Sequence, residues 1–423
     1  MDIWRSLLGM AVLLLIGLAI SNNRRAIRPR VVVAALLCQI AIGALVLFVP
    51  FGKDILAAAA NGVNHVLDYG HEGAAFLFGG LVDSKMFVLF GDSGFVFAFR
   101  VLSAIIFVTA LVSVLYYIGL MKWFVIILGT LFHKVIGVSR LESFSAVTTI
   151  FVGQSEMPAV VKPFINRMNG AELFTVMSSG MAAVAGSVLA GYAGMGVKME
   201  YLLAASFMAI PGGLLFAKII HPDTEPSQVE FNEIHFDEKR PTNIIEAAAS
   251  GVLVGLQIAL NVGAMLIAFI ALIALCNGAV GGFFGLFGHP EWNLEFLMGA
   301  AFSPLAWMIG VPWQDAQIAG NFIDQKMIIN EFVAYSQLSA YLKDAGTVAA
   351  SGLQALDPRT IAIVSFALCG FANFASIAIL AGGFAAVAPE RRSEVTRYGL
   401  RVVTAGTLSN LMSATIAGIF LSL

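Results

Sequence analysis

Long apolar stretches separated by short polar loops dominate the chain. An α-helix needs about 20 predominantly apolar residues to cross a bilayer. Stretches of this kind predict eight membrane-spanning helices, near residues 4–21, 31–50, 96–119, 172–194, 200–219, 246–277, 360–386 and 398–422. Three shorter apolar segments are Gly-rich or amphipathic and predict interfacial or partly buried helices, near 72–90, 121–137 and 292–311. The pattern therefore predicts an all-α polytopic membrane protein.

Two other segments are apolar at both ends and polar in the middle. Residues 141–168 place Gly153-Gln154-Ser155-Glu156 between two apolar halves, and residues 316–343 place Asn330-Glu331 in the same way. Each half has about ten residues, which is too short to cross a bilayer. Irregular backbone at membrane depth is tolerated only where protein or a water-filled cavity surrounds it. Both segments are therefore predicted to be re-entrant helical hairpins.

The order of these elements repeats once along the chain. N-terminal scaffold helices and an interfacial helix (1–95) precede a unit of span, hairpin, span and span (96–220), and the same order returns at 243–423 after a polar loop at 221–242. Three crossings separate the starts of the two units, so the second unit is inverted. Inverted repeats with broken helices are typical of secondary transporters, whose substrate sites lie near the bilayer midplane.

Polar residues at membrane depth indicate where such a site would form. Small or polar residues interrupt the span after each hairpin, at Gly186-Ser187 and at 370–376. A carboxylate in the membrane costs about 2.5–3.5 kcal/mol on insertion scales, so Glu156 and Glu331 are functional candidates, with buried structural acceptors as the alternative. Asn373 has a similar alternative, because asparagine also joins helices in membranes.

Composition and charge support a membrane protein and orient it. Charged residues make up only 12% of the 423 residues against 59% apolar residues, which excludes a soluble protein. Basic residues gather in three loops, near 21–30, 122–140 and 389–401, and all three fall inside if the N-terminus is outside. Both termini are then predicted to be periplasmic. A net charge of −2 argues against nucleic acid as a partner.

Three sequence motifs resemble those of one transporter family. G-Q-S-E at 153–156, N-E-F-V-A-Y at 330–335 and G-F-A-N-F-A-S at 370–376 occur in order and in matching contexts. They are similar to the motifs of the concentrative nucleoside transporters, and the resemblance covers nearly the whole chain. It implies a bacterial inner-membrane homotrimer with eight transmembrane helices, two re-entrant hairpins and interfacial helices, in which a transport domain moves against a scaffold domain like an elevator.

The resemblance also implies roles for individual residues. The first hairpin and its following helix would hold the nucleobase, through Gln154, Ser155, Glu156 and Val188. The second hairpin and its following helix would hold the ribose, through Glu331, Asn373 and Ser376, with Phe371 beside them. The residue chemistry agrees, because amides match a base edge and a carboxylate accepts strong hydrogen bonds from ribose hydroxyls.

The coupling cation is left open between sodium and a proton, and no cofactor is expected. Sodium-coupled relatives resemble one another in an Asn and a Ser or Thr near the first hairpin. Here those positions are Thr149 and Ala183, while Val152 and Val184 still offer carbonyl oxygens. Proton coupling through Glu156 or Glu331 is the competing hypothesis.

Two other functions are weighed against nucleoside symport. An elevator-type symporter for another polar solute, such as a dicarboxylate, would need Arg or Lys at the hairpin tips, where this chain has Glu. An intramembrane enzyme would need a nucleophile–base pair or a metal cluster, and the sequence shows no HExxH, GxSxG or phosphate-loop motif. The sequence therefore favours a cation-coupled nucleoside symporter using alternating access.

Overall fold

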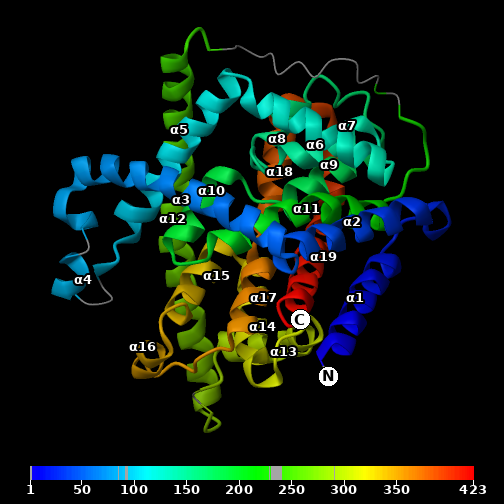
Figure 1. The fold of residues 1–423 in the computed structure, drawn as a ribbon. Helices are drawn as coiled ribbons and strands as arrows, with labels where there is room; N and C mark the ends of the chain where they lie inside the picture. Colours follow the sequence, from blue (N-terminus) through cyan, green and yellow to red (C-terminus); the bar gives the residue numbers. More distant parts are fainter. Residues whose placement is uncertain (1, 84, 91–93, 228, 230–240, 290) are drawn as a thin grey trace.

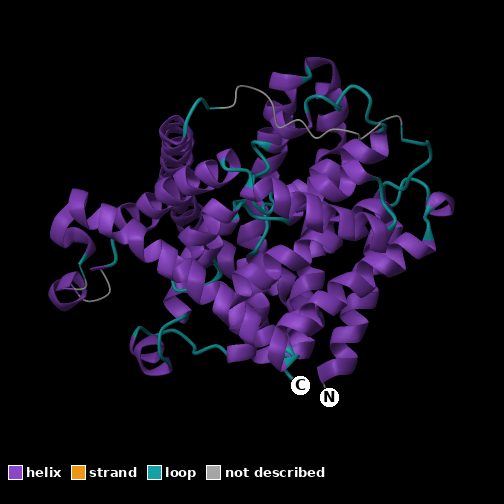
Figure 2. Cartoon of the chain, turned by 45° about the horizontal axis from the view of Figure 1, so that its top comes forward, coloured by secondary structure: helices purple, strands orange, loops and turns teal. Residues whose placement is uncertain are grey.

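The computed structural model describes residues 2–83, 85–90, 94–227, 229, 241–289 and 291–423, and all regular elements within them are helices. Helices cross one another in several directions rather than forming a parallel bundle (Figure 1). The N- and C-termini lie side by side at one end of the molecule in both views (Figures 1 and 2). This placement agrees with an even number of membrane crossings. The all-α prediction is confirmed.

Short turns separate the helices of the N-terminal half. Its α-helices are α1 (Asp2–Ala19), α2 (Pro29–Leu47), α3 (Pro50–Phe78), α4 (Lys85–Phe90), α5 (Ser103–Tyr117), α6 (Leu120–Ile136), α7 (Arg140–Thr148), α8 (Met157–Val161), α9 (Gly170–Ala182), α10 (Gly186–Gly194) and α11 (Met199–Ile220). Its other helical turns are the 3-10 turns η1 (Arg24–Ala26) and η2 (Gly79–Val82) and the π-helical turn η4 (Ala98–Leu102).

The C-terminal half begins with the longest helix of the chain. Its α-helices are α12 (Ile244–Gly285), α13 (Leu294–Met308), α14 (Trp313–Ile328), α15 (Glu331–Leu338), α16 (Ala345–Ala350), α17 (Pro358–Leu368), α18 (Phe374–Val387) and α19 (Arg392–Phe420). Two 3-10 turns accompany them, η5 (Ser339–Tyr341) and η6 (Pro389–Arg391).

Within the described residues, six helices are long and apolar enough to cross a bilayer, or seven if the sharply bent pair α13–α14 is one span. They match the predicted spans except for 4–21 and 360–386. The first of these is α1, one of the shorter apolar helices, and the second is divided into α17 and α18. The count of eight crossings stays a prediction.

Both predicted hairpins form two short helical arms. α7 and α8 flank the tip of the first, and α14 and α15 flank the tip of the second. The two hairpins lie toward opposite ends of the molecule (Figure 1), which fits inverted units. Their re-entry into a membrane stays a prediction. The predicted breaks are confirmed, because α9 ends at Ala182 before α10 begins, and α17 ends at Leu368 before α18 begins.

The expectation of an interfacial helix near 72–90 was wrong in its limits. The structure instead has α3, a 29-residue helix that starts at Pro50 and ends at Phe78. Proline at the first helical turn, following extended Val49, starts α3 directly after α2. One face of α3 is polar and includes Asn64, Asp68 and His71. The helix therefore contains no continuous apolar run of the length that predicts a membrane-spanning helix.

Two packed groups of helices surround the site. α9, α11, α17 and α19 pack on one another, and α1 and α2 pack against α11 and α19. α5 and α12 form a separate, closely packed pair. Gly251 and Gly255 of α12 allow this approach, since a Cβ at either would lie 2.7–2.8 Å from a Cα atom of α5. The site lies where this pair meets the hairpins.

Polar contacts hold the outer arms of the first hairpin. Buried Lys218 at the end of α11 forms ion pairs with Glu142 of α7 and with Asp223, the latter at 2.5 Å. At the other arm, Arg391 donates to the carbonyl oxygens of Ile165 at 2.7 Å and Met168 at 2.9 Å. The hairpin is thereby fixed to α11 and to the start of α19.

Candidate functional site

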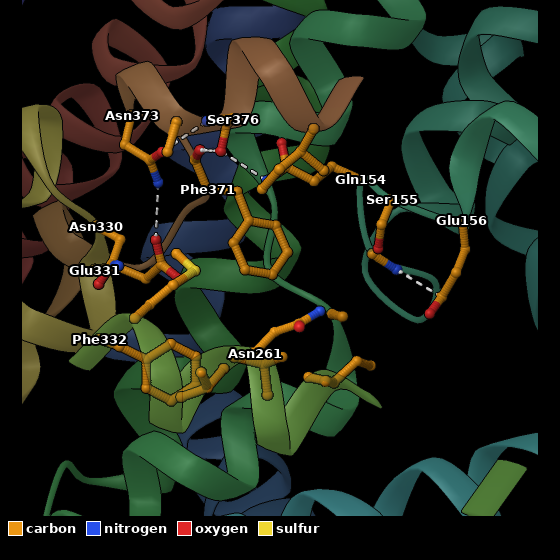
Figure 3. A pocket seen from close by; sticks show the side chains of 18 of the residues that line it. Gln154, Ser155, Glu156, Asn261, Asn330, Glu331, Phe332, Phe371, Asn373 and Ser376 are labelled. Carbon is orange, nitrogen blue, oxygen red and sulfur yellow. Dashed lines mark hydrogen bonds between the residues drawn. The ribbon is translucent and has the colours of Figure 1, made fainter. Parts of the chain in front are cut away.

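A cavity of about 400 Å³ lies between the two hairpin tips and the two helix breaks. It falls in the size range of pockets for small organic ligands, roughly 300–1,000 Å³. Its polar lining comes from both hairpins, from the start of α18 and from α12 (Figure 3). The labelled lining residues are Gln154, Ser155, Glu156, Asn261, Asn330, Glu331, Phe332, Phe371, Asn373 and Ser376.

Glu331 is fully enclosed and hydrogen-bonded at one end of this cavity. It is the first residue of α15, after the capping residue Asn330, whose side chain accepts from the backbone N–H of Val333 at 2.9 Å. The Tyr192 hydroxyl donates to Oε1 of Glu331 at 3.1 Å, and Nδ2 of Asn373 donates to Oε2 at 3.2 Å. The carboxylate is thus held by two neutral donors from helices on both sides.

The start of α18 presents three groups to the cavity. Asn373 caps this helix by accepting from the backbone N–H of Ser376 at 2.9 Å. The Ser376 hydroxyl donates to the carbonyl oxygen of Phe371 at 2.6 Å and accepts from Nε2 of Gln154 at 2.6 Å. Oε1 of buried Gln154 has no hydrogen-bond partner within the described structure. An acceptor of that kind is ready to receive a ligand N–H or O–H.

Glu156 lies on the other side of the Phe371 ring from Glu331 (Figure 3). Its Oε2 accepts from the backbone N–H of Gly153 at 3.2 Å, which closes the tip of the first hairpin. The side chain also borders a smaller cavity of about 190 Å³ on the far side of the tip, together with Val152, Ser113 of α5 and Ser250 of α12. Glu156 therefore contacts two separate spaces.

All eight residues that the sequence placed at a substrate site line the same cavity. Gln154 and Ser155 do not cap α8, because Glu156 occupies its N-cap and Gln154 donates to Ser376. Asn261 of α12 also lines the cavity, and its Oδ1 accepts from Nε2 of Gln257 on the same helix at 3.1 Å. Sequence reasoning missed it because α12 has no break to draw attention.

The residues of the possible sodium site lie around the first hairpin and the break after α9. The Thr149 hydroxyl donates to the carbonyl of Ala146 at 2.8 Å. The Ala183 carbonyl accepts from the backbone N–H of Phe371 at 3.3 Å, and Val152 borders the smaller cavity. These four residues therefore offer backbone carbonyl oxygens and the Thr149 hydroxyl. None of the four is an Asn or a Ser.

The chemistry of the cavity is that of hydrogen bonding to a neutral polar ligand. Two carboxylates, four amides and two serine hydroxyls surround apolar Val188, Phe332 and Phe371. Of the described residues that line it, none is Lys or Arg. In the described part of the chain, no group of three or more His, Cys, Asp or Glu side chains is placed to hold a metal ion.

Models of known sequence families match most of the chain. The model described as the C-terminus of Na+-dependent nucleoside transporters matches residues 201–418, and the corresponding N-terminal model matches residues 8–81. A third model, described as nucleoside recognition, matches residues 98–199. Together they span both hairpins and both helix breaks.

Individual relatives agree along nearly their whole length. The chain is 55% identical to NupX of Escherichia coli K12 over 423 residues, which is 100% of both chains. It is 47% identical to the nucleoside permease NupC of Helicobacter pylori, over 99% of this chain and 98% of that one. The solved structure of CNTnw in an inward-facing substrate-bound state is 54% identical, with a TM-score of 0.94 over 100% of this chain and 98% of that chain. The chain therefore belongs to the family of concentrative, Na+-dependent nucleoside transporters.

Proposed function

We propose that this protein imports nucleosides, such as uridine, by symport with a cation through alternating access. The observation that carries the proposal is the cavity that both hairpins share, in which a buried carboxylate and a group of amides face apolar and aromatic walls. A nucleoside has the matching parts: a flat base with donors and acceptors, and a ribose rich in hydroxyl donors. No bond of such a substrate needs to change, so the proposed activity is transport and not an enzymatic reaction.

Glu331, Asn373 and Ser376 are proposed to bind the ribose, with Phe371 beside them. The carboxylate of Glu331 keeps acceptor capacity beyond its bonds to Tyr192 and Asn373, because an ionised carboxylate offers about four lone-pair sites. Hydrogen bonds from hydroxyls to a carboxylate are roughly twice as strong as neutral ones. Glu331 therefore supplies the strongest polar contact that this end of the cavity offers.

Gln154, Ser155, Glu156 and Val188 are proposed to bind the nucleobase. The free Oε1 of Gln154 can accept from an imide N–H of the base, and Glu156 can accept directly or through a water molecule. A dicarboxylate is a poor candidate for the same cavity, because the two carboxylates that line it would repel the substrate's negative charges. None of the described lining residues is a Lys or Arg that could offset this repulsion.

The coupling cation is proposed to act at the first hairpin. Sodium would use the oxygens near Thr149, Val152, Ala183 and Val184, and a proton would use Glu156. The two cavities that meet at Glu156 support this location, because a cation could reach the carboxylate from the side opposite the substrate. The family description favours sodium as the cation to test first.

The proposed assembly is a homotrimer in the bacterial inner membrane, with both termini periplasmic. The exposed apolar surface of α12, which includes Leu253, Leu260 and Ile267, supports contact with lipid or with neighbouring subunits. In an elevator movement, the group that carries the hairpins would slide along the α5–α12 pair.

Uptake of labelled uridine into proteoliposomes tests this function. We expect accumulation under an inward sodium or proton gradient, and the gradient that drives it identifies the cation. Glu331→Ala should abolish uptake, whereas Glu72→Ala, which removes an exposed carboxylate on α3, should not. Absence of uptake under both gradients by folded protein would refute the proposal.

A further inference from the structure

A buried lysine of the second hairpin contacts the end of a broken helix. Lys326 lies near the end of α14 and is 1% exposed. Its Nζ donates to the carbonyl oxygen of Ala367 at 2.9 Å and to Oδ1 of Asn410 at 2.6 Å. Ala367 is in the last turn of α17, immediately before the break that leads to the cavity. The lysine therefore contacts the backbone that precedes Phe371 and Asn373.

Asn410 extends this contact to the other repeat unit. Its Nδ2, from α19, donates to the carbonyl oxygen of Ala182 at 2.7 Å and to that of Cys369 at 3.0 Å. Ala182 is the last residue of α9, and Cys369 follows the last residue of α17. One lysine and one asparagine thus contact the C-terminal ends of both broken helices.

The charge of the lysine matches the helix ends that it faces. The C-terminus of a helix carries about −0.5 elementary charge, so two such ends carry roughly one unit. In its protonated form, Lys326 supplies one positive unit. Unpaired carbonyl groups at membrane depth are costly, and Lys326 with Asn410 satisfies three of them.

The same ends lead directly into the substrate cavity. The carbonyl of Ala183, one residue after α9, accepts from the backbone N–H of Phe371 at 3.3 Å, which joins the two breaks. A Cβ at Gly370 would lie 2.2 Å from Oδ1 of Asn410. Glycine is therefore required at position 370 for the Asn410 side chain to lie against this break.

We propose that Lys326 is a positioning residue for substrate binding, a built-in cation that fixes both helix breaks through Asn410. This inference rests on the proposed function, because its readout is nucleoside affinity. By fixing the backbone at 367–369 and 182–183, the lysine holds Phe371 and Asn373 in the orientation that the ligand meets. It touches no substrate itself.

Equilibrium binding of uridine, measured by calorimetry on purified protein, tests the inference with two variants. Lys326→Met keeps the volume and removes the charge, and it should weaken binding about tenfold or more, the usual cost of leaving buried partners unsatisfied. Lys326→Ala removes the side chain beyond Cβ, and the missing part is n-propylammonium. We expect n-propylammonium chloride to restore binding to Lys326→Ala but not to Lys326→Met.

The outcomes separate this inference from the proposed function. If the unsubstituted protein binds no uridine, the proposed function fails and the inference with it. If that protein binds uridine and Lys326→Met binds it within about twofold, the inference alone is overturned. It is also overturned if n-propylammonium restores binding to both variants alike, because the added cation would then act without occupying the space that the lysine side chain leaves.

Discussion

The two carboxylates at the hairpin tips differ in their surroundings. Glu331 is 3% exposed and already accepts from a tyrosine hydroxyl and an asparagine amide. Glu156 is partly exposed, accepts from one backbone N–H and borders two cavities. A carboxylate with fixed partners suits a constant ligand contact, whereas one that is open on two sides suits exchange of a proton or cation. Glu331 is therefore expected to serve substrate binding alone, and Glu156 to serve both the nucleobase contact and coupling.

Glu331→Gln tests the ribose contact at the level of single atoms. We expect uridine affinity to fall by about ten- to a hundredfold, because a hydrogen bond to a charged acceptor is worth about 1.5–3 kcal/mol. An analogue lacking the contacted ribose hydroxyl should bind weakly to the unsubstituted protein, and the substitution should cost it little further affinity. Calorimetry on the four combinations gives the coupling energy, and additive losses would place Glu331 away from the ribose.

Asn261 provides a second residue-scale prediction, from the helix that the sequence had not implicated. Its amide lines the cavity from α12, opposite the groups of α18 (Figure 3). Asn261→Leu should weaken uridine binding by several-fold, since it removes a polar group from the lining. Ser250→Leu, on the same helix but bordering only the smaller cavity, should leave equilibrium affinity unchanged. Equal losses in both variants would contradict a direct contact for Asn261.

Individual residues were predictable where a charged side chain lies in an apolar segment. They were not predictable where their role depends on contacts with residues far away in the sequence. Glu156 and Glu331 were found because a carboxylate in an apolar segment is costly. The role of Lys326 could not be predicted, because its partners Ala367 and Asn410 are 41 and 84 residues away in the sequence. The role of Asn410 depends in the same way on its bonds to the ends of α9 and α17, whose contacted residues lie far from it in the sequence.

At the scale of elements, the length of the apolar runs predicted most of the long helices. Polar residues between two short apolar halves predicted the hairpins. The limits of α3 were not predicted, because the polar face of this 29-residue helix interrupts its apolar pattern. Limits of other helices shifted as well: the span expected at 246–277 is part of the 42-residue α12. Such shifts are expected because capping and packing, and not hydrophobicity, decide where a helix ends.

The close packing of α5 and α12 gives a prediction at this scale. Gly255→Val should destabilise the protein by about 1–3 kcal/mol, because the added atoms would meet the backbone of α5 and force the pair apart. Gly278→Val, on the same helix, is the matched control because a Cβ there meets no atom within 4 Å. Thermal unfolding in detergent measures both, and equal midpoints would show that the two helices need not touch.

At the scale of the whole molecule, both hairpins pack on the group of α9, α11 and α17 through α7 and α14, whereas α5 and α12 pack on each other. The smaller cavity lies between these groups, with Val152 of the first hairpin on one side and Ser250 of α12 on the other. If transport moves one group past the other, a covalent link across this cavity must stop it. A link within the α5–α12 pair must not.

Paired cysteines turn this contrast into a measurement. In a chain whose three native cysteines are replaced, Val152→Cys with Ser250→Cys should be joined by a short bifunctional thiol reagent, because both positions border one cavity. Uridine uptake should then fall to background and return if the link is reversible and is cleaved. Ser113→Cys with Ser250→Cys joins α5 to α12 across the same cavity, and uptake should persist after its linkage. Persistent uptake with the first pair fully linked would show that the hairpin does not move relative to α12, because a sliding movement requires that distance to change in every cycle.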